Sequence, residues 1–156
     1  MHLGYNNNKY KYSLHTFDIK ESNCEKILGV YIDDKLSFRL VIIHIYNCIK
    51  KASNVCNMLL TNVYNVDNTM LINLYKIYAR PYLDYASVIY SPHYLQMIDI
   101  IENVQRKFTK RLKGLTNVCY VDRLNMVSLE SLELRRLHCD VIMLFKILHG
   151  ITIMWH

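Results

Sequence analysis

Cationic side chains are concentrated in the segment IENVQRKFTKRLKGL, which spans residues 101–115. At 100° per residue, Lys110 points away from the apolar side of this segment, and Arg106, Lys107, Arg111 and Lys113 spread on either side of it. The apolar stripe consists of Ile101, Val104, Phe108, Leu112 and Leu115. A helix that docks by this stripe presents cations outward, and a polyanion is the partner that such a surface attracts. The alternative is a solvated basic face without a partner, which is common in soluble proteins.

The letters YIDD at residues 31–34 match the Y-x-D-D box that holds magnesium in palm-type polymerases. Two-metal chemistry needs a further carboxylate from a strand well upstream, and the stretch before residue 31 is too short to build a palm. We also predict that a helix, not a second strand, follows the box. We therefore interpret Asp33 and Asp34 as a solvated turn and predict no catalytic residue in this chain.

The tyrosines, one His-Cys pair and two further basic pairs are the other residues that could bind a ligand. Tyrosines at positions 75, 78, 82 and 85 recur at helical spacing and would either stack on nucleic-acid bases or form an amphipathic packing face. His138-Cys139 has no further ligand at metal-binding spacing, so we predict no metal site and no cofactor in this chain. The smaller basic pairs Lys50-Lys51 and Arg135-Arg136 are expected to face solvent.

The elements that position these residues are predicted to be mainly helical, because only four glycines and two prolines interrupt the chain. Residues 10–14 and 27–32 read as short strands that pair as one hairpin. Helical periodicity covers residues 44–63, 82–90, 94–113, 120–126 and 129–149, and a further helix starts at Asn68 or Thr69 and runs to residue 80, with a kink or break at Pro81 and helix ends at Gly114 and Gly150. The buried stripe of the last helix is predicted to be Leu134, Leu137, Val141, Leu144 and Leu148.

Composition indicates a folded protein that favours acidic partners. Hydrophobic residues make up 52% of the 156 residues and charged ones 21%, and the net charge is +6. The five cysteines are an odd number without a close pair, which predicts reduced, buried thiols in an intracellular protein. The apolar run Leu40–Tyr46 is far shorter than the ~20 residues that span a bilayer, so we predict no membrane partner.

Five segments in order resemble the C-terminal part of the reverse transcriptase region of non-LTR retrotransposons, the LINE-like elements of the jockey and CR1 type. The segments are ILGVYIDDKLSF at 27–38, IKKASNVCNML at 49–59, LYKIYARPYLDYASVIYSP at 74–92, IDIIENVQRKFTKRLKGL at 98–115 and YVDRLNMVSLESLELRRLHCDVIMLFKILHG at 120–150. No single segment is decisive, but their common order makes the resemblance specific.

The resemblance implies that the parent is an RNA-directed DNA polymerase that copies element RNA in the nucleus. Residues 1–38 would be a β-hairpin remnant of the palm edge, residues 39–150 a helical, bundle-like thumb and connector region, and residues 151–156 a truncated tail. The catalytic palm with its magnesium would be missing, so the chain alone is expected to be inactive. The region would hold the RNA/DNA template-primer duplex by backbone contacts from Lys107, Lys110, Arg111 and Lys113, with Arg106 and Lys50 or Lys51 as weaker candidates.

Two alternatives stay open. A helical protein-protein interaction module would dock exposed apolar stripes on the missing palm or on a second copy of the chain. A non-functional relic is the other, since the chain departs from the family pattern between Phe38 and His44, at Tyr90 and after Gly150.

Overall fold

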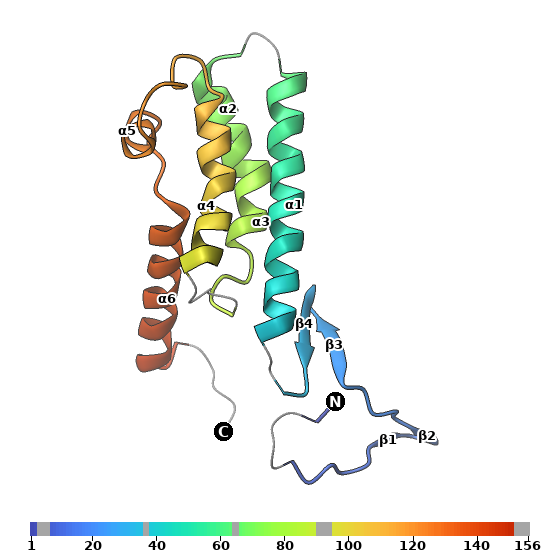
Figure 1. The fold of residues 1–156 in the computed structure, drawn as a ribbon. Helices are drawn as coiled ribbons and strands as arrows, with labels where there is room; N and C mark the ends of the chain where they lie inside the picture. The colour runs from blue at the N-terminus through green and yellow to red at the C-terminus, as the bar shows by residue number, and fades with distance from the viewer. Residues whose placement is uncertain (3–6, 36–37, 64–65, 90–94, 152–156) are drawn as a thin grey trace. The chain divides into compact units, whose positions relative to one another are not determined.

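A computed structural model describes residues 1–2, 7–35, 38–63, 66–89 and 95–151 of the chain (Figure 1). The fold is mainly α-helical with small antiparallel strand pairs near the N-terminus, as predicted. Contacts divide the chain into two compact units, Met1–Tyr46 and Asn47–His156. The expectations for Tyr90, for a helix start at Tyr94 and for residues 152–156 of the tail fall outside the described residues.

The strands of the first unit form two separate hairpins. Strand β1 (Ser13–Leu14) pairs with β2 (Phe17–Asp18), and β3 (Cys24–Ile27) pairs with β4 (Val30–Asp33). The predicted single hairpin between residues 10–14 and 27–32 is therefore wrong. Leu28 and Gly29, with φ of 50° and 85°, form the two-residue turn between β3 and β4. Positive φ at both turn positions matches the right-handed twist of the flanking strands, so the chain reverses inside the run predicted as one strand.

Helix α1 (Phe38–Asn62) follows β4 and a turn at Asp34-Lys35. It begins at Phe38 rather than at His44, where the periodicity placed its start. Ala52, Cys56 and Leu59 are buried, as their spacing predicts.

The segment around Pro81 is a continuous run of helix in which the spacing of the backbone hydrogen bonds changes locally. Helix α2 (Asn68–Leu74) passes through a π-helical segment, η1 (Tyr75–Ala79), into α3 (Arg80–Asp84). Pro81 has no backbone N–H to donate, so a regular α-helical ladder would lose one hydrogen bond here. The Arg80 N–H donates to the Tyr75 carbonyl instead, at the five-residue spacing of a π-turn. The predicted irregularity at Pro81 is thus a π-helical segment.

The predicted helix over residues 82–90 ends early. Tyr85 is extended (φ −62°, ψ 128°) and Ala86 has a φ of 57°, so the helical ladder stops at Asp84. The Ser87 and Ile89 N–H groups then donate to carbonyls three residues earlier, which makes residues 85–89 a chain of turns.

The basic helix, α4 (Leu95–Lys110), is shorter than predicted at its C-terminal end. The N–H groups of Arg111 and Leu112 donate to carbonyls three residues earlier, and Gly114 (φ 77°) turns the chain. Arg111 and Lys113 therefore lie beyond the helix. The apolar stripe is confirmed: Ile101, Val104, Phe108, Leu112 and Leu115 are all at most 5% exposed.

Helix α5 (Tyr120–Met126) has its predicted bounds, and α6 (Leu132–Leu148) packs on α3 and α4. Ser131 caps α6 by accepting a hydrogen bond from the Leu134 N–H, and Gly150 (φ 63°) follows its end as predicted. The predicted buried stripe of α6 is wrong, because all of its members are 43–74% exposed. Leu132 and Arg136 face the interior instead, at 1% and 5% exposure.

Candidate functional site

Helix α4 separates an interior face from a cationic outer face. Phe108, 1% exposed, stacks on the buried ring of Tyr75 with 4.7 Å between centroids, and this contact fixes the rotation of α4. Lys107 and Lys110 are consequently exposed on the opposite side. Both side chains lie where the sequence predicts them.

Arg106 is only partly available to a ligand. Its Nη1 lies 2.9 Å from Asp99 Oδ1, and its guanidinium sits 5.2 Å from the centre of the Tyr120 ring. Because Asp99 offsets part of its charge, Arg106 presents less positive charge to a ligand than the exposed Lys107 does.

Arg111 and Lys113 are positioned by side chains from distant helices. Arg111 Nη1 donates to Asn57 Oδ1 of α1 at 2.9 Å. The Lys113 backbone forms two hydrogen bonds with the Asn68 side chain, N–H to Oδ1 at 3.1 Å and carbonyl from Nδ2 at 2.9 Å. Asn68 thereby holds the turn after α4, and both cationic side chains stay exposed.

Two depressions flank Lys107. One of about 150 Å³ lies toward α1 and includes Asn57 and Arg111; the other, of about 500 Å³, includes Lys110 and Asn117. Among the described residues that line them there is no carboxylate. This surface, made of Lys107, Lys110, Arg111 and the two depressions, is called the basic surface below.

The predicted pair Lys50 and Lys51 divides between two sides of α1. Both are exposed. Lys50 precedes Asn57 by two turns and lies on the same side of the helix, the side that contacts Arg111. Lys51 is rotated by about 100° from Lys50, so only Lys50 lies on the side of α1 that borders the basic surface.

Behind the basic surface lies a buried polar network that sequence reasoning missed. Gln105, fully buried, accepts from the Tyr75 hydroxyl at 2.9 Å and donates to Tyr120 at 3.1 Å and to the Glu130 carbonyl at 2.9 Å. The Tyr120 hydroxyl donates to Glu102. The signal was present in the sequence: Glu102, Gln105 and Thr109 recur at helical spacing along one border of the apolar stripe.

Burial in this network changes the acidity of its phenols. Burial raises the pKa of Tyr75 well above its ordinary value, and nearby anionic groups add to the effect. Burial, followed by the hydrogen bond to Glu102, also raises the pKa of Tyr120. Tyr75 is buried and is therefore a packing residue, whereas Tyr78, Tyr82 and Tyr85 are exposed.

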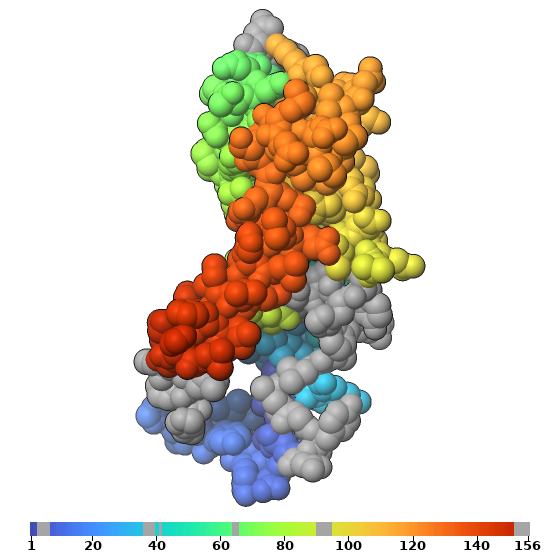
Figure 2. Space-filling model, turned by 90° about the vertical axis from the view of Figure 1, so that its left-hand side faces the viewer, coloured from blue at the N-terminus to red at the C-terminus, as the bar shows by residue number. Residues whose placement is uncertain are grey.

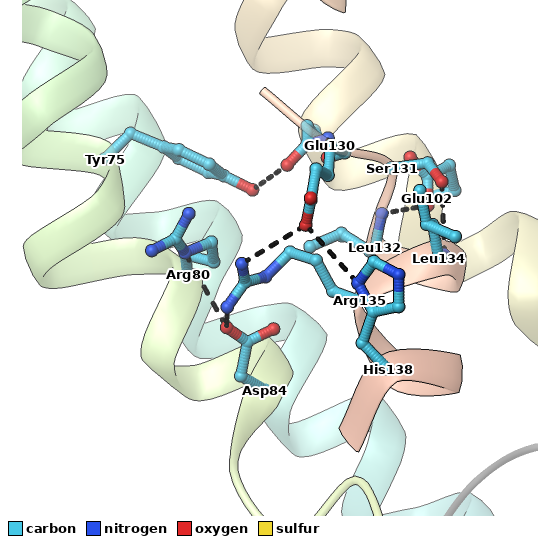
Figure 3. A network of polar contacts seen from close by, with 11 residues as sticks. Tyr75, Arg80, Asp84, Glu102, Glu130, Ser131, Leu132, Leu134, Arg135 and His138 are labelled. Atoms are coloured by element: carbon cyan, nitrogen blue, oxygen red, sulfur yellow. Dashed lines mark hydrogen bonds and ion pairs between the residues drawn. The ribbon is translucent and has the colours of Figure 1, made fainter. Parts of the chain in front are cut away.

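The first turn of α6 is held by carboxylates from other elements (Figure 3). Glu102, 4% exposed, accepts hydrogen bonds from the N–H groups of Leu132 at 2.9 Å and Glu133 at 3.3 Å. Arg135 bridges Asp84 at 3.0 Å and Glu130 at 3.7 Å. The expectation that Arg135-Arg136 faces solvent is wrong, since Arg135 is half-buried in ion pairs and Arg136 is buried.

The YIDD segment at residues 31–34 lies at the end of β4 and in the turn after it. The prediction of a solvated turn is right only for the turn at Asp34: Asp33 is the last residue of strand β4, and both side chains are half-buried. Within the described residues, no three His, Cys, Asp or Glu side chains are grouped so as to hold a metal ion. No helix in the described part of the chain has the length and apolar character to cross a membrane.

The prediction that the cysteines are buried is wrong in part. Cys56 is buried, but Cys24 and Cys119 are exposed.

The chain has a distant similarity to a nematode protein. No protein-family model matches the chain, and no solved structure matches it. An uncharacterized protein of Caenorhabditis elegans, B0403.1, is 24% identical over 127 residues, which cover 80% of this chain. The aligned region spans 61% of the length of that relative.

Proposed function

We propose that this chain is the thumb and connector region of a non-LTR retrotransposon reverse transcriptase, and that it holds the RNA/DNA template-primer duplex through the phosphate backbone. The five ordered segments that resemble this family support the assignment. The observation that carries the binding role is the basic surface, whose described lining residues include Lys107, Lys110 and Arg111 but no carboxylate.

The physical basis of binding is electrostatic. Lysine and arginine side chains that contact phosphates release condensed counterions, so affinity falls steeply with salt and depends little on base sequence. The buried stripe of α4 and the Asn57 and Asn68 contacts hold these cations on a rigid support. A preorganised surface loses less conformational entropy when it binds than flexible side chains do.

The test measures RNA/DNA duplex binding by the full chain at several salt concentrations. Replacing Lys107 or Lys110 by alanine is expected to weaken binding about equally for all sequences and to reduce the salt slope by about one for each phosphate that is no longer neutralised. Lys146→Ala, an exposed lysine on α6, is the matched control and should bind as the native chain does. A flat salt response, or full binding by the Lys107→Ala/Lys110→Ala double variant, would contradict the proposal.

In this proposal polymerization, magnesium binding and nuclear action belong to the parent enzyme. The isolated chain is therefore expected to give no primer extension. Primer extension that depends on Asp33 would overturn this view, and the variant Asp33→Ala provides that check.

A second candidate function is self-association through α6, which the exposed apolar residues of that helix favour. Leu134, Leu137, Val141, Leu144 and Leu148 alternate spacings of three and four residues, which is the pattern of a coiled-coil seam. A second copy of the chain offers the same pattern and would cover these side chains. Light scattering after size-exclusion chromatography should then show a dimer that Leu137→Glu converts to a monomer, and a native chain that is monomeric at high concentration would exclude this function.

A further inference from the structure

A depression of about 450 Å³ lies between α2, the turn after α4 and the C-terminal end of α5, and it shares no lining residue with the basic surface. Figure 2 shows the green atoms of α2 adjoining the orange atoms of the segment around α5. The volume falls within the range of small-molecule sites in proteins. Ile72 and Leu115, 6% and 4% exposed, provide an apolar floor, and Met126 and Val127 form one wall.

Apart from Asn68, the uncharged polar side chains around this floor are not committed to the fold. The side chains of Thr69, Asn73 and Ser128 make no hydrogen bond to any other residue that the structure describes. Each can donate to a ligand, and a site with an apolar floor and a few such groups at its edge is typical of ligand pockets.

The charge of the depression is positive. Lys76, half-buried, and Lys113, exposed, both line it, and no carboxylate occurs among its described lining residues. Lysine ammonium groups bind phosphate as point charges. The depression therefore favours a ligand that combines an anionic group with an apolar body.

One wall of the depression is preorganised. The two hydrogen bonds between the Asn68 side chain and the Lys113 backbone, one donated by each residue, join the start of α2 to the turn after α4. Gly114, with a φ of 77°, completes that turn. A wall held in this way keeps Lys113, which follows Arg111 of the basic surface by two residues, at the edge of the depression.

We propose that this depression binds one nucleoside monophosphate unit, with its base against the apolar floor and its phosphate near Lys76 and Lys113. Thr69, Asn73 and Ser128 donate to the base and sugar. The unit comes either from a free nucleotide or from the unpaired end of a nucleic-acid strand. Only the strand-end source rests on the proposed function, since that strand would be held by the adjoining basic surface.

Calorimetric titration of the full chain with adenosine monophosphate, adenosine and inorganic phosphate tests the site. The monophosphate is expected to bind at one site per chain, and adenosine and phosphate are each expected to bind at least about tenfold more weakly because each lacks half of the contacts. Failure of adenosine monophosphate to bind at millimolar concentration would overturn the inference.

Two isosteric substitutions separate this site from the basic surface. Asn73→Asp places a carboxylate in the depression, and Asn103→Asp places the same group in the 500 Å³ depression beside Lys107. Asn73→Asp should weaken adenosine monophosphate binding about tenfold and leave blunt-duplex binding unchanged, while Asn103→Asp should do the reverse. Lys76→Ala is also expected to weaken adenosine monophosphate binding. If Lys76→Ala and Asn73→Asp both bind the monophosphate as the native chain does, the proposed location of the site is wrong.

A duplex with one unpaired nucleotide identifies the source of the ligand. A preference for this duplex over a blunt one that Asn73→Asp abolishes supports a strand end, and equal binding of the two duplexes alongside monophosphate binding supports a free nucleotide. If no duplex binds but the monophosphate does, the proposed function fails while the pocket stands. If a duplex binds but the monophosphate does not, the inferred pocket fails while the proposed function stands.

Discussion

At the scale of single residues, Glu102 links three parts of the helical unit. It is buried on α4, accepts from the Tyr120 hydroxyl of α5 and accepts from two N–H groups at the start of α6. A carboxylate at this position satisfies N–H groups that have no partner within their own helix and interacts favourably with the helix dipole. The tertiary placement of α6 therefore depends strongly on one side chain.

We predict that Glu102→Gln lowers the free energy of unfolding by about 2 kcal/mol, because hydrogen bonds to an anion are replaced by weaker neutral ones. Urea denaturation followed by circular dichroism measures the change. Glu133→Gln, an exposed glutamate in the first turn of the same helix, is the control and should cost much less. Equal losses in the two variants would mean that Glu102 has no special role.

Cysteine reactivity provides a second prediction at this scale. Burial raises the pKa of the Cys56 thiol to about 12, although the nearby Arg111 partly opposes this effect. Because the thiolate is the reactive form, Cys56 should resist iodoacetamide at pH 8 while the exposed Cys24 and Cys119 are alkylated first. Mass spectrometry of timed samples identifies the order, and early modification of Cys56 in folded protein would contradict its burial.

The candidate cations could be found from sequence, but their partners could not. Periodicity alone places Lys107 and Lys110 opposite the apolar stripe. The hydrogen bonds that position Arg111 and Lys113 join residues far apart in sequence. Arg111 contacts Asn57, and the Lys113 backbone contacts Asn68. Helical spacing carries no information about such long-range pairs, and so Lys50 and Lys51 could not be told apart.

At the scale of elements, sequence patterns located most helices but not always their faces. The bounds of α5 were predicted correctly, and Pro81 marked an irregularity that proved to be a π-helical segment. The face of α6 was predicted wrongly because its apolar residues surround much of the helix, so periodicity alone could not tell which side packs. The choice is made by tertiary contacts, since the Glu102 cap and the Arg135 ion pairs turn Leu132 and Arg136 inward.

This rotation of α6 predicts opposite outcomes for two leucines of one helix. Leu132→Ala, at a site 1% exposed, is expected to cost about 2–5 kcal/mol of unfolding free energy through the cavity that it creates. Leu137→Glu, at a site 55% exposed, should change it by no more than about 0.5 kcal/mol. Urea unfolding at low protein concentration measures both, and a large loss in Leu137→Glu would place the predicted stripe in the interior after all.

At the scale of the whole molecule, the two units differ in how much of their backbone is protected. The residues of β1, β2 and β3 are all exposed. The centre of α4 is surrounded by buried side chains such as Phe108 and Thr109. Local opening is easiest where few apolar contacts hold the backbone, so the first unit should open well below the free energy of global unfolding.

Hydrogen-deuterium exchange tests this difference in the full chain. Amides of residues 13–27 are expected to exchange first, and those of residues 101–109 last, because only the latter require opening of the core. Peptide-level mass spectrometry resolves both segments. Equal protection of the two would show that the hairpins unfold together with the helices.

The position of Glu102 also has a consequence for the order in which the chain folds during synthesis. The ribosome makes α4 before α6, so the carboxylate that receives the Leu132 and Glu133 N–H groups is in place before those residues emerge. Starting an isolated helix is costly because several residues must be ordered before the first hydrogen bond forms. A preformed acceptor on α4 lowers that cost for α6, so α6 is expected to form on the folded surface of the helices that precede it.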